Sequence, residues 1–124
     1  MNPYLLLAGL LMLVIGVVHS LLGERLVFSR LRGSGWLPQD PAGPLRKPHL
    51  RILWATWHAA SVQGWGVAAV LIHASGAPVP AMVLDALMLA TAVSGLLVLL
   101  ATRGRHPGWI VLLVVSLLIG LGER

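Results

Sequence analysis

Four long apolar segments, separated by short polar connections, limit most strongly what this chain can fold into. They run approximately over residues 4–23, 52–72, 79–101 and 109–121. A helix of about 20 residues crosses the hydrocarbon core of a bilayer. The first three segments reach that length, whereas the fourth is shorter and needs local thinning of the bilayer. The segments lack the strict polar–apolar alternation of strands, so we expect helices.

The composition favours a membrane environment for these helices. Of the 124 residues, 57% are hydrophobic and only 10% are charged. Soluble domains carry about 25% charged residues. This chain therefore has too little polar surface to cover a globule in water. We predict an all-α fold, an integral membrane four-helix transmembrane bundle, formed as a single domain by residues 1–124.

The uneven distribution of basic residues predicts the orientation of the bundle. Eight of the nine Lys and Arg residues lie in the connection 24–51 or at Arg103 and Arg105. Cytoplasmic loops carry an excess of such residues. We expect the connection 24–51 in the cytoplasm and both termini on the non-cytoplasmic side, in a bacterial cytoplasmic membrane. Lipid headgroup contacts are expected at five of these residues, which are Arg25, Arg30, Arg32, Arg46 and Lys47.

Several functional classes are excluded by residues that the sequence lacks. The chain contains no cysteine, which excludes disulfides, thiolate zinc sites, iron–sulfur clusters and thiol catalysis. No Walker-type or GxGxxG glycine pattern is present. The net charge of +5 arises from residues that flank apolar spans, so we expect no binding of nucleic acid. Trp36 and Trp109 suit anchors at the membrane interface.

One face of the first helix combines small residues with a histidine. Gly9, Gly16 and Gly23 repeat at heptad spacing, and such a stripe lets another helix approach closely inside a membrane. His19 lies three residues after Gly16 and four before Gly23, so it projects from the same side. We expect His19 to face another helix.

A second histidine lies in the middle of the second helix. His58 shares a face with Trp54, Ser61 and Trp65. With Arg25 and Arg51 as markers of the inner boundary, His19 lies about 9 Å and His58 about 10 Å below it, at 1.5 Å rise per residue. The sequence thus predicts two imidazoles at matched depth on adjacent antiparallel helices.

These histidines predict a site for a transition-metal ion or heme b. Neutral imidazole binds zinc, copper, iron and nickel, and two histidines on facing helices suit heme. The expected ligands are His19 and His58, with His106 or Glu24 completing a metal site. Glu24 lies about 7.5 Å along the helix axis from His19, so the two share an ion only if Gly23 distorts the helix. In an alternative that is equally compatible with the sequence, the histidines bind no ion and only hold the helices together by hydrogen bonds to a backbone carbonyl, Ser61 or Ser20.

The functional hypotheses therefore belong to two classes. In the first, the histidine site binds a metal or heme, and the sequence does not decide whether it is an enzyme. In the second, the chain is an accessory or assembly subunit that packs through its glycine stripe and short fourth helix. Expected partners are the lipid bilayer and either further copies of the chain or a larger membrane complex.

A limited resemblance points to a third class, the transporters. The size, the four helices and the opening MNPY resemble the small multidrug resistance transporters, which depend on a glutamate in the middle of the first helix. The corresponding region here, Leu10 to Gly16, reads LLMLVIG and carries no acid. The chain is therefore not assigned to that family.

Overall fold

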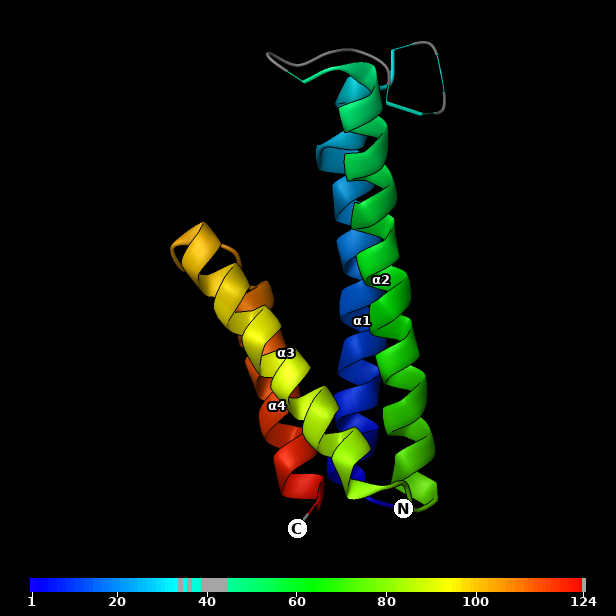
Figure 1. Ribbon diagram of the computed structural model, residues 1–124, viewed down its shortest axis with the longest axis vertical. Helices are drawn as coiled ribbons and strands as arrows, with labels where there is room; N and C mark the ends of the chain where they lie inside the picture. Colours follow the sequence, from blue (N-terminus) through cyan, green and yellow to red (C-terminus); the bar gives the residue numbers. More distant parts are fainter. Residues whose placement is uncertain (34, 36, 39–44, 124) are drawn as a thin grey trace. The chain divides into compact units, whose positions relative to one another are not determined.

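The computed structural model describes residues 1–33, 35, 37–38 and 45–123, and Trp36 lies outside this set. Helix α1 spans Pro3–Leu26, a short 3-10 helix η1 spans Phe28–Leu31, and α2 spans Lys47–Gly76. Helix α3 spans Ala81–Thr102 and α4 spans Gly108–Glu123 (Figure 1). The described residues contain no strand. The all-helical fold with four α-helices is confirmed.

The second helix differs most from its predicted bounds, because it begins at Lys47 rather than near residue 52. Pro48 occupies its first turn, where the missing N–H costs nothing, and the Leu50 N–H already donates to the Arg46 carbonyl at 3.2 Å. The predicted connection 24–51 is correspondingly shorter, since both of its ends are helical.

Helix ends follow from local hydrogen bonds. The Asn2 side-chain oxygen accepts from the N–H groups of Tyr4 at 3.1 Å and Leu5 at 3.2 Å, which caps the start of α1. At the end of α3, Arg103 adopts φ 51° and Gly104 adopts φ 76°. The Gly104 N–H donates to the Leu99 carbonyl at 2.9 Å, closing the helix as expected for a left-handed cap.

Within the described residues, two helical stretches are long and apolar enough to cross a membrane: Pro3–Leu31 and Ala81–Thr102. Helix α4 is a shorter apolar helix. Helix α2, where a span was expected from the sequence, is not one of these two stretches. Polar residues such as His58, Ser61 and Gln63 interrupt its apolar sequence.

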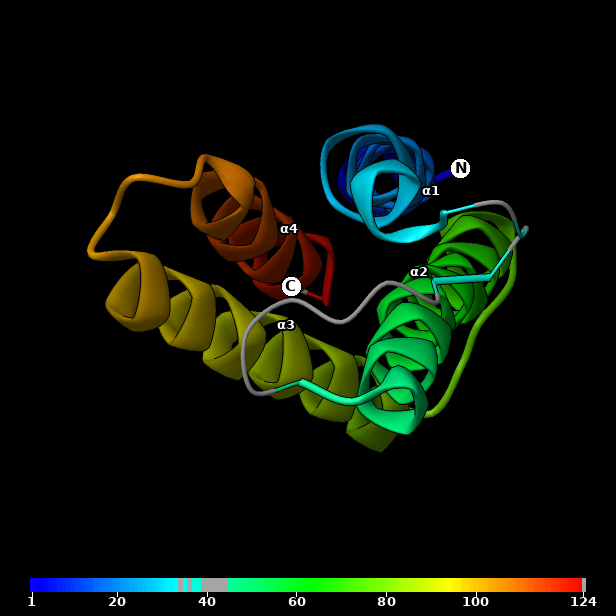
Figure 2. The same cartoon turned by 90° about the horizontal axis from the view of Figure 1, so that it is seen from above.

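The chain forms two compact units, residues 1–15 with 64–124 and residues 16–63. Whether they act as the single domain expected from the sequence stays a prediction. Viewed from above, α1 lies beside α2 and α4 lies beside α3 (Figure 2).

The larger unit, residues 1–15 with 64–124, has an apolar core. Gly9 lets α1 approach α2, because a Cβ there would lie 2.7 Å from Ile72 Cγ1 and 3.0 Å from the Ala68 carbonyl oxygen. Gly95 allows the same closeness between α3 and α4. The buried core is made of Leu5, Ala8, Met12, Ala68, Leu71, Leu84, Val115 and Ile119.

Candidate functional site

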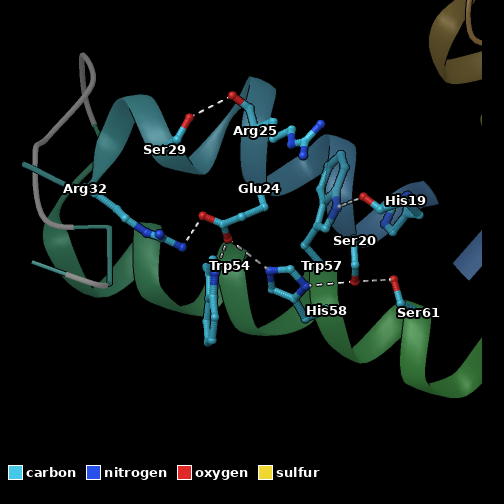
Figure 3. A network of polar contacts seen from close by, with 10 residues as sticks. All are labelled: His19, Ser20, Glu24, Arg25, Ser29, Arg32, Trp54, Trp57, His58 and Ser61. Carbon is cyan, nitrogen blue, oxygen red and sulfur yellow. Dashed lines mark hydrogen bonds and ion pairs between the residues drawn. The ribbon is translucent and has the colours of Figure 1, made fainter. Parts of the chain in front are cut away.

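The smaller unit, residues 16–63, contains a chain of polar side chains between α1, η1 and α2 (Figure 3). We call it the polar cluster, and it consists of Ser20, Glu24, Arg32, His58 and Ser61. Ser20 and Glu24 are four residues apart on α1, while His58 and Ser61 are three apart on α2. Residues at these spacings share one helix face. Each helix thus directs its two polar residues into the α1–α2 contact.

His58 stands at the centre of the polar cluster. Its Nδ1 lies 2.9 Å from Ser20 Oγ, and Ser20 Oγ donates to Ser61 Oγ at 2.9 Å. Its Nε2 lies 3.5 Å from Glu24 Oε2 and has no hydrogen-bond partner. The imidazole is therefore fixed at one nitrogen and open toward a carboxylate at the other (Figure 3).

Glu24 is held by two further groups. Its Oε1 forms an ion pair with the Arg32 guanidinium, and its Oε2 accepts from the Trp54 indole N–H at 3.2 Å. Arg32 reaches Glu24 because α1 ends at Leu26 and η1 follows. The Glu24 side chain is 27% exposed, so solvent screens this ion pair in part.

Aromatic rings cover the polar cluster. Trp54 meets the His58 ring edge-on, with 4.8 Å between the ring centroids. Phe28, fully buried in η1, lies 5.7 Å from the Trp57 ring and 6.0 Å from the His58 ring. These rings limit the access of water to His58, which strengthens the electrostatic interactions around it.

His19 faces α2, as expected, but its ring has neighbours different from those of His58. It stacks on Trp57 with centroids 4.4 Å apart and planes within 6°. The Trp57 indole N–H donates to the His19 carbonyl at 3.0 Å. A Cβ on Gly23 would overlap the Trp57 ring. Gly23 therefore makes room for this indole between the helices.

Of the four expected metal ligands, the structure brings together Glu24 and His58. In the part of the chain that the structure describes, no three His, Asp or Glu side chains form a group that could hold a metal ion. His106 belongs to the other unit, where its Nδ1 accepts from the Gly108 N–H at 3.1 Å. The Glu24 carboxylate, expected to complete a site of His19 and His58, lies against His58.

The structure also gives roles to residues outside the predicted ligand set. Arg32, expected at lipid headgroups, pairs with Glu24, and Trp54 donates to that carboxylate. The contact between Ser20 and His58 is the kind of hydrogen bond that the alternative without an ion predicted. No sequence signal indicated Arg32, which looks like any other arginine of a basic connection.

Comparison with known proteins gives no function for the polar cluster. The chain matches no family model, and comparison with the curated proteins and with the solved structures found no match. The interpretation of the polar cluster therefore depends on its geometry.

Proposed function

We propose that this chain is a small multi-pass membrane protein that binds a divalent transition-metal ion between His58 Nε2 and Glu24 Oε2. The observation that carries the proposal is the 3.5 Å separation of these two atoms, with no hydrogen bond to Nε2. Imidazole nitrogen and carboxylate oxygen are both common ligands of such ions.

The separation of the two atoms suits a shared ion better than a direct hydrogen bond. Charge-assisted N–H···O bonds are about 2.7–2.9 Å long, shorter than the 3.5 Å found here. Two ligands of a tetrahedral ion, each bonded at about 2.0–2.1 Å, lie about 3.3 Å apart. His58 and Glu24 would supply two positions, and water or a small ligand would fill the others.

The hydrogen bonds around His58 favour a cation at the same place. Ser20 Oγ donates to Ser61, so in the tautomer with hydrogen on Nδ1 the imidazole donates to Ser20. Its Nε2 then faces the Glu24 carboxylate, a place that suits a positive species, either a metal ion or a proton.

The surrounding residues match the outer shell of a metal site. Such shells orient imidazole and carboxylate ligands through hydrogen bonds. Ser20 fixes the His58 ring, and Arg32 and Trp54 hold the Glu24 carboxylate. Heme b receives less support, because bis-histidine ligation needs His19, whose ring is stacked on Trp57.

The membrane location is supported by the apolar helices and their exposed side chains. Pro3–Leu31 and Ala81–Thr102 are long and apolar enough to span a bilayer. Both carry large aliphatic side chains that are exposed, among them Leu21 and Leu100. We place the polar cluster in the cytoplasmic leaflet of a bacterial inner membrane, with both termini outside, because it adjoins the basic residues.

The alternative proposal, an accessory subunit without chemistry of its own, uses the glycine stripe of α1. Two of those glycines already serve contacts within the chain, Gly9 against Ile72 and Gly23 against Trp57. They are therefore occupied before any partner binds, which makes the metal site the better supported function.

Metal analysis of the protein purified in detergent tests the proposal. We expect one transition-metal ion per chain, and a visible spectrum of tetrahedral Co²⁺ after substitution. His58→Ala and Glu24→Gln should abolish binding, whereas His73→Ala, a matched change at an exposed histidine of the same helix, should leave it unchanged.

Three outcomes would overturn the assignment of the site. Metal that persists in His58→Ala places the ion elsewhere. A Soret band that disappears in both His19→Ala and His58→Ala indicates heme instead. A colourless, metal-free protein that copurifies with a larger complex supports the accessory subunit.

A further inference from the structure

A strongly basic surface covers the same unit as the polar cluster. We call it the basic surface, and it consists of Arg25, Arg30, Arg46, Lys47 and Arg51. All five side chains are exposed. None of them forms an ion pair with a carboxylate of the described residues. Arg32 is not part of this surface, because its guanidinium binds Glu24.

The described part of this unit offers few carboxylates that could neutralise these cations. Glu24 is the only carboxylate among the described residues of 16–63, and it already contacts Arg32 and His58. The five cations therefore have no carboxylate partner among the described residues. Like charges repel each other, and an anionic partner would reduce that repulsion.

Exposed aliphatic side chains neighbour these cations along the chain. Leu26 follows Arg25 and is 56% exposed, and Ile52 follows Arg51 and is 60% exposed. Leu45 and Leu53 are also exposed, at 39% and 41%. The surface therefore presents cationic and apolar groups side by side, a combination that matches an amphiphilic partner.

We propose that the basic surface binds an acidic phospholipid, with its phosphate at the cations and its acyl chains against the exposed aliphatics. Basic clusters at the membrane surface attract anionic lipids. A soluble phosphate would make no use of Leu26 and Ile52. The inference rests on the membrane location proposed above, but not on the metal site.

A lipid titration of the detergent-purified protein tests this inference. Short-chain phosphatidylglycerol, matched phosphatidylcholine and inorganic phosphate are compared, with retained lipid measured by native mass spectrometry and the unfolding temperature as second readout. We expect binding of phosphatidylglycerol alone. Each cation contributes about fivefold in affinity, so Arg25→Gln with Arg30→Gln should weaken binding about 30-fold. The control pair Arg103→Gln with Arg105→Gln removes the same charge from exposed positions of the other unit and should leave affinity unchanged.

Three other results of this titration would contradict the inference. Equal binding of phosphatidylcholine means that only the apolar contacts matter. Equal binding of inorganic phosphate means that the site recognises a free anion rather than a lipid. Equal loss in the control pair means that overall charge, and not the basic surface, attracts the lipid. The substituted arginines form no ion pair with Glu24 or His58, so the metal content of these variants should not change and failure here leaves the metal proposal standing.

Discussion

The two units of this chain satisfy their polar groups in different ways. In residues 1–15 with 64–124, buried hydroxyls bond to helix carbonyls: Thr91 to Leu87 at 2.8 Å and Ser116 to Met88 at 3.0 Å. In residues 16–63, the side chains of the polar cluster instead contact one another, and the described buried atoms without a hydrogen bond belong to Glu24, Arg32 and His58.

The hydrogen bonds of the larger unit serve the packing of helices, whereas those of the polar cluster support the site proposed above. A hydroxyl that bonds to a carbonyl needs no partner side chain, and its helix can pack as if it were apolar. Buried polar groups that remain unsatisfied are costly, so they call for an explanation such as a bound ion. The unit of residues 16–63 contains such groups, which supports the metal site proposed there.

The largest effect on stability is expected at Gly23, where the Trp57 indole packs against α1. Gly23→Ala places a methyl group inside that rigid ring, and overpacking of this kind costs about 1–3 kcal/mol. Thermal unfolding in detergent, followed by circular dichroism, should show a clear loss. The control is Gly66→Ala, because a Cβ at Gly66 meets no atom within 4 Å. Equal unfolding temperatures for both variants would contradict the close packing at Trp57.

The second prediction compares the metal affinity of two variants, each lacking one serine hydroxyl of a different unit. Ser20→Ala removes the contact to His58 Nδ1, and loss of an outer-shell partner weakens metal binding about 10–100-fold. Ser116→Ala, in the unit of residues 1–15 with 64–124, should leave the affinity unchanged. Titration with Zn²⁺ in competition with a chelator measures both. If the two variants bind metal equally well, the polar cluster does not orient a metal ligand.

A smaller effect is expected from the hydrogen bond between Trp54 and Glu24. Trp54→Phe keeps a ring against His58 but removes the N–H that donates to the carboxylate at 3.2 Å. The free energy of unfolding should fall by about 1 kcal/mol. Trp65→Phe, at a partly exposed indole in the other unit, provides the control. A loss shared by both variants would point to ring size rather than to the hydrogen bond.

The sequence predicted the helices but not the contacts between α1 and α2 that form the polar cluster. Apolar length and turn residues predicted four helices, since both depend on local sequence. The pairing of Glu24 with His58 depends on how α1 and α2 are rotated against each other, which no local pattern specifies. Arg32 reaches Glu24 because the chain leaves α1 after Leu26 and forms η1. The glycine and histidine face of α1 was predictable, because helical periodicity fixes it.

The smallest effect should come from a buried hydroxyl of the larger unit. Thr91 is 4% exposed and donates to the carbonyls of Leu87 and Met88 in its own helix. Those carbonyls keep their helical hydrogen bonds in Thr91→Val, so no group loses its only partner. The free energy of unfolding should therefore change little, and by less than in Trp54→Phe, as measured by thermal unfolding of both variants. A loss at Thr91 as large as that at Trp54 would erase the distinction between the two units, because buried hydrogen bonds would then contribute equally in both.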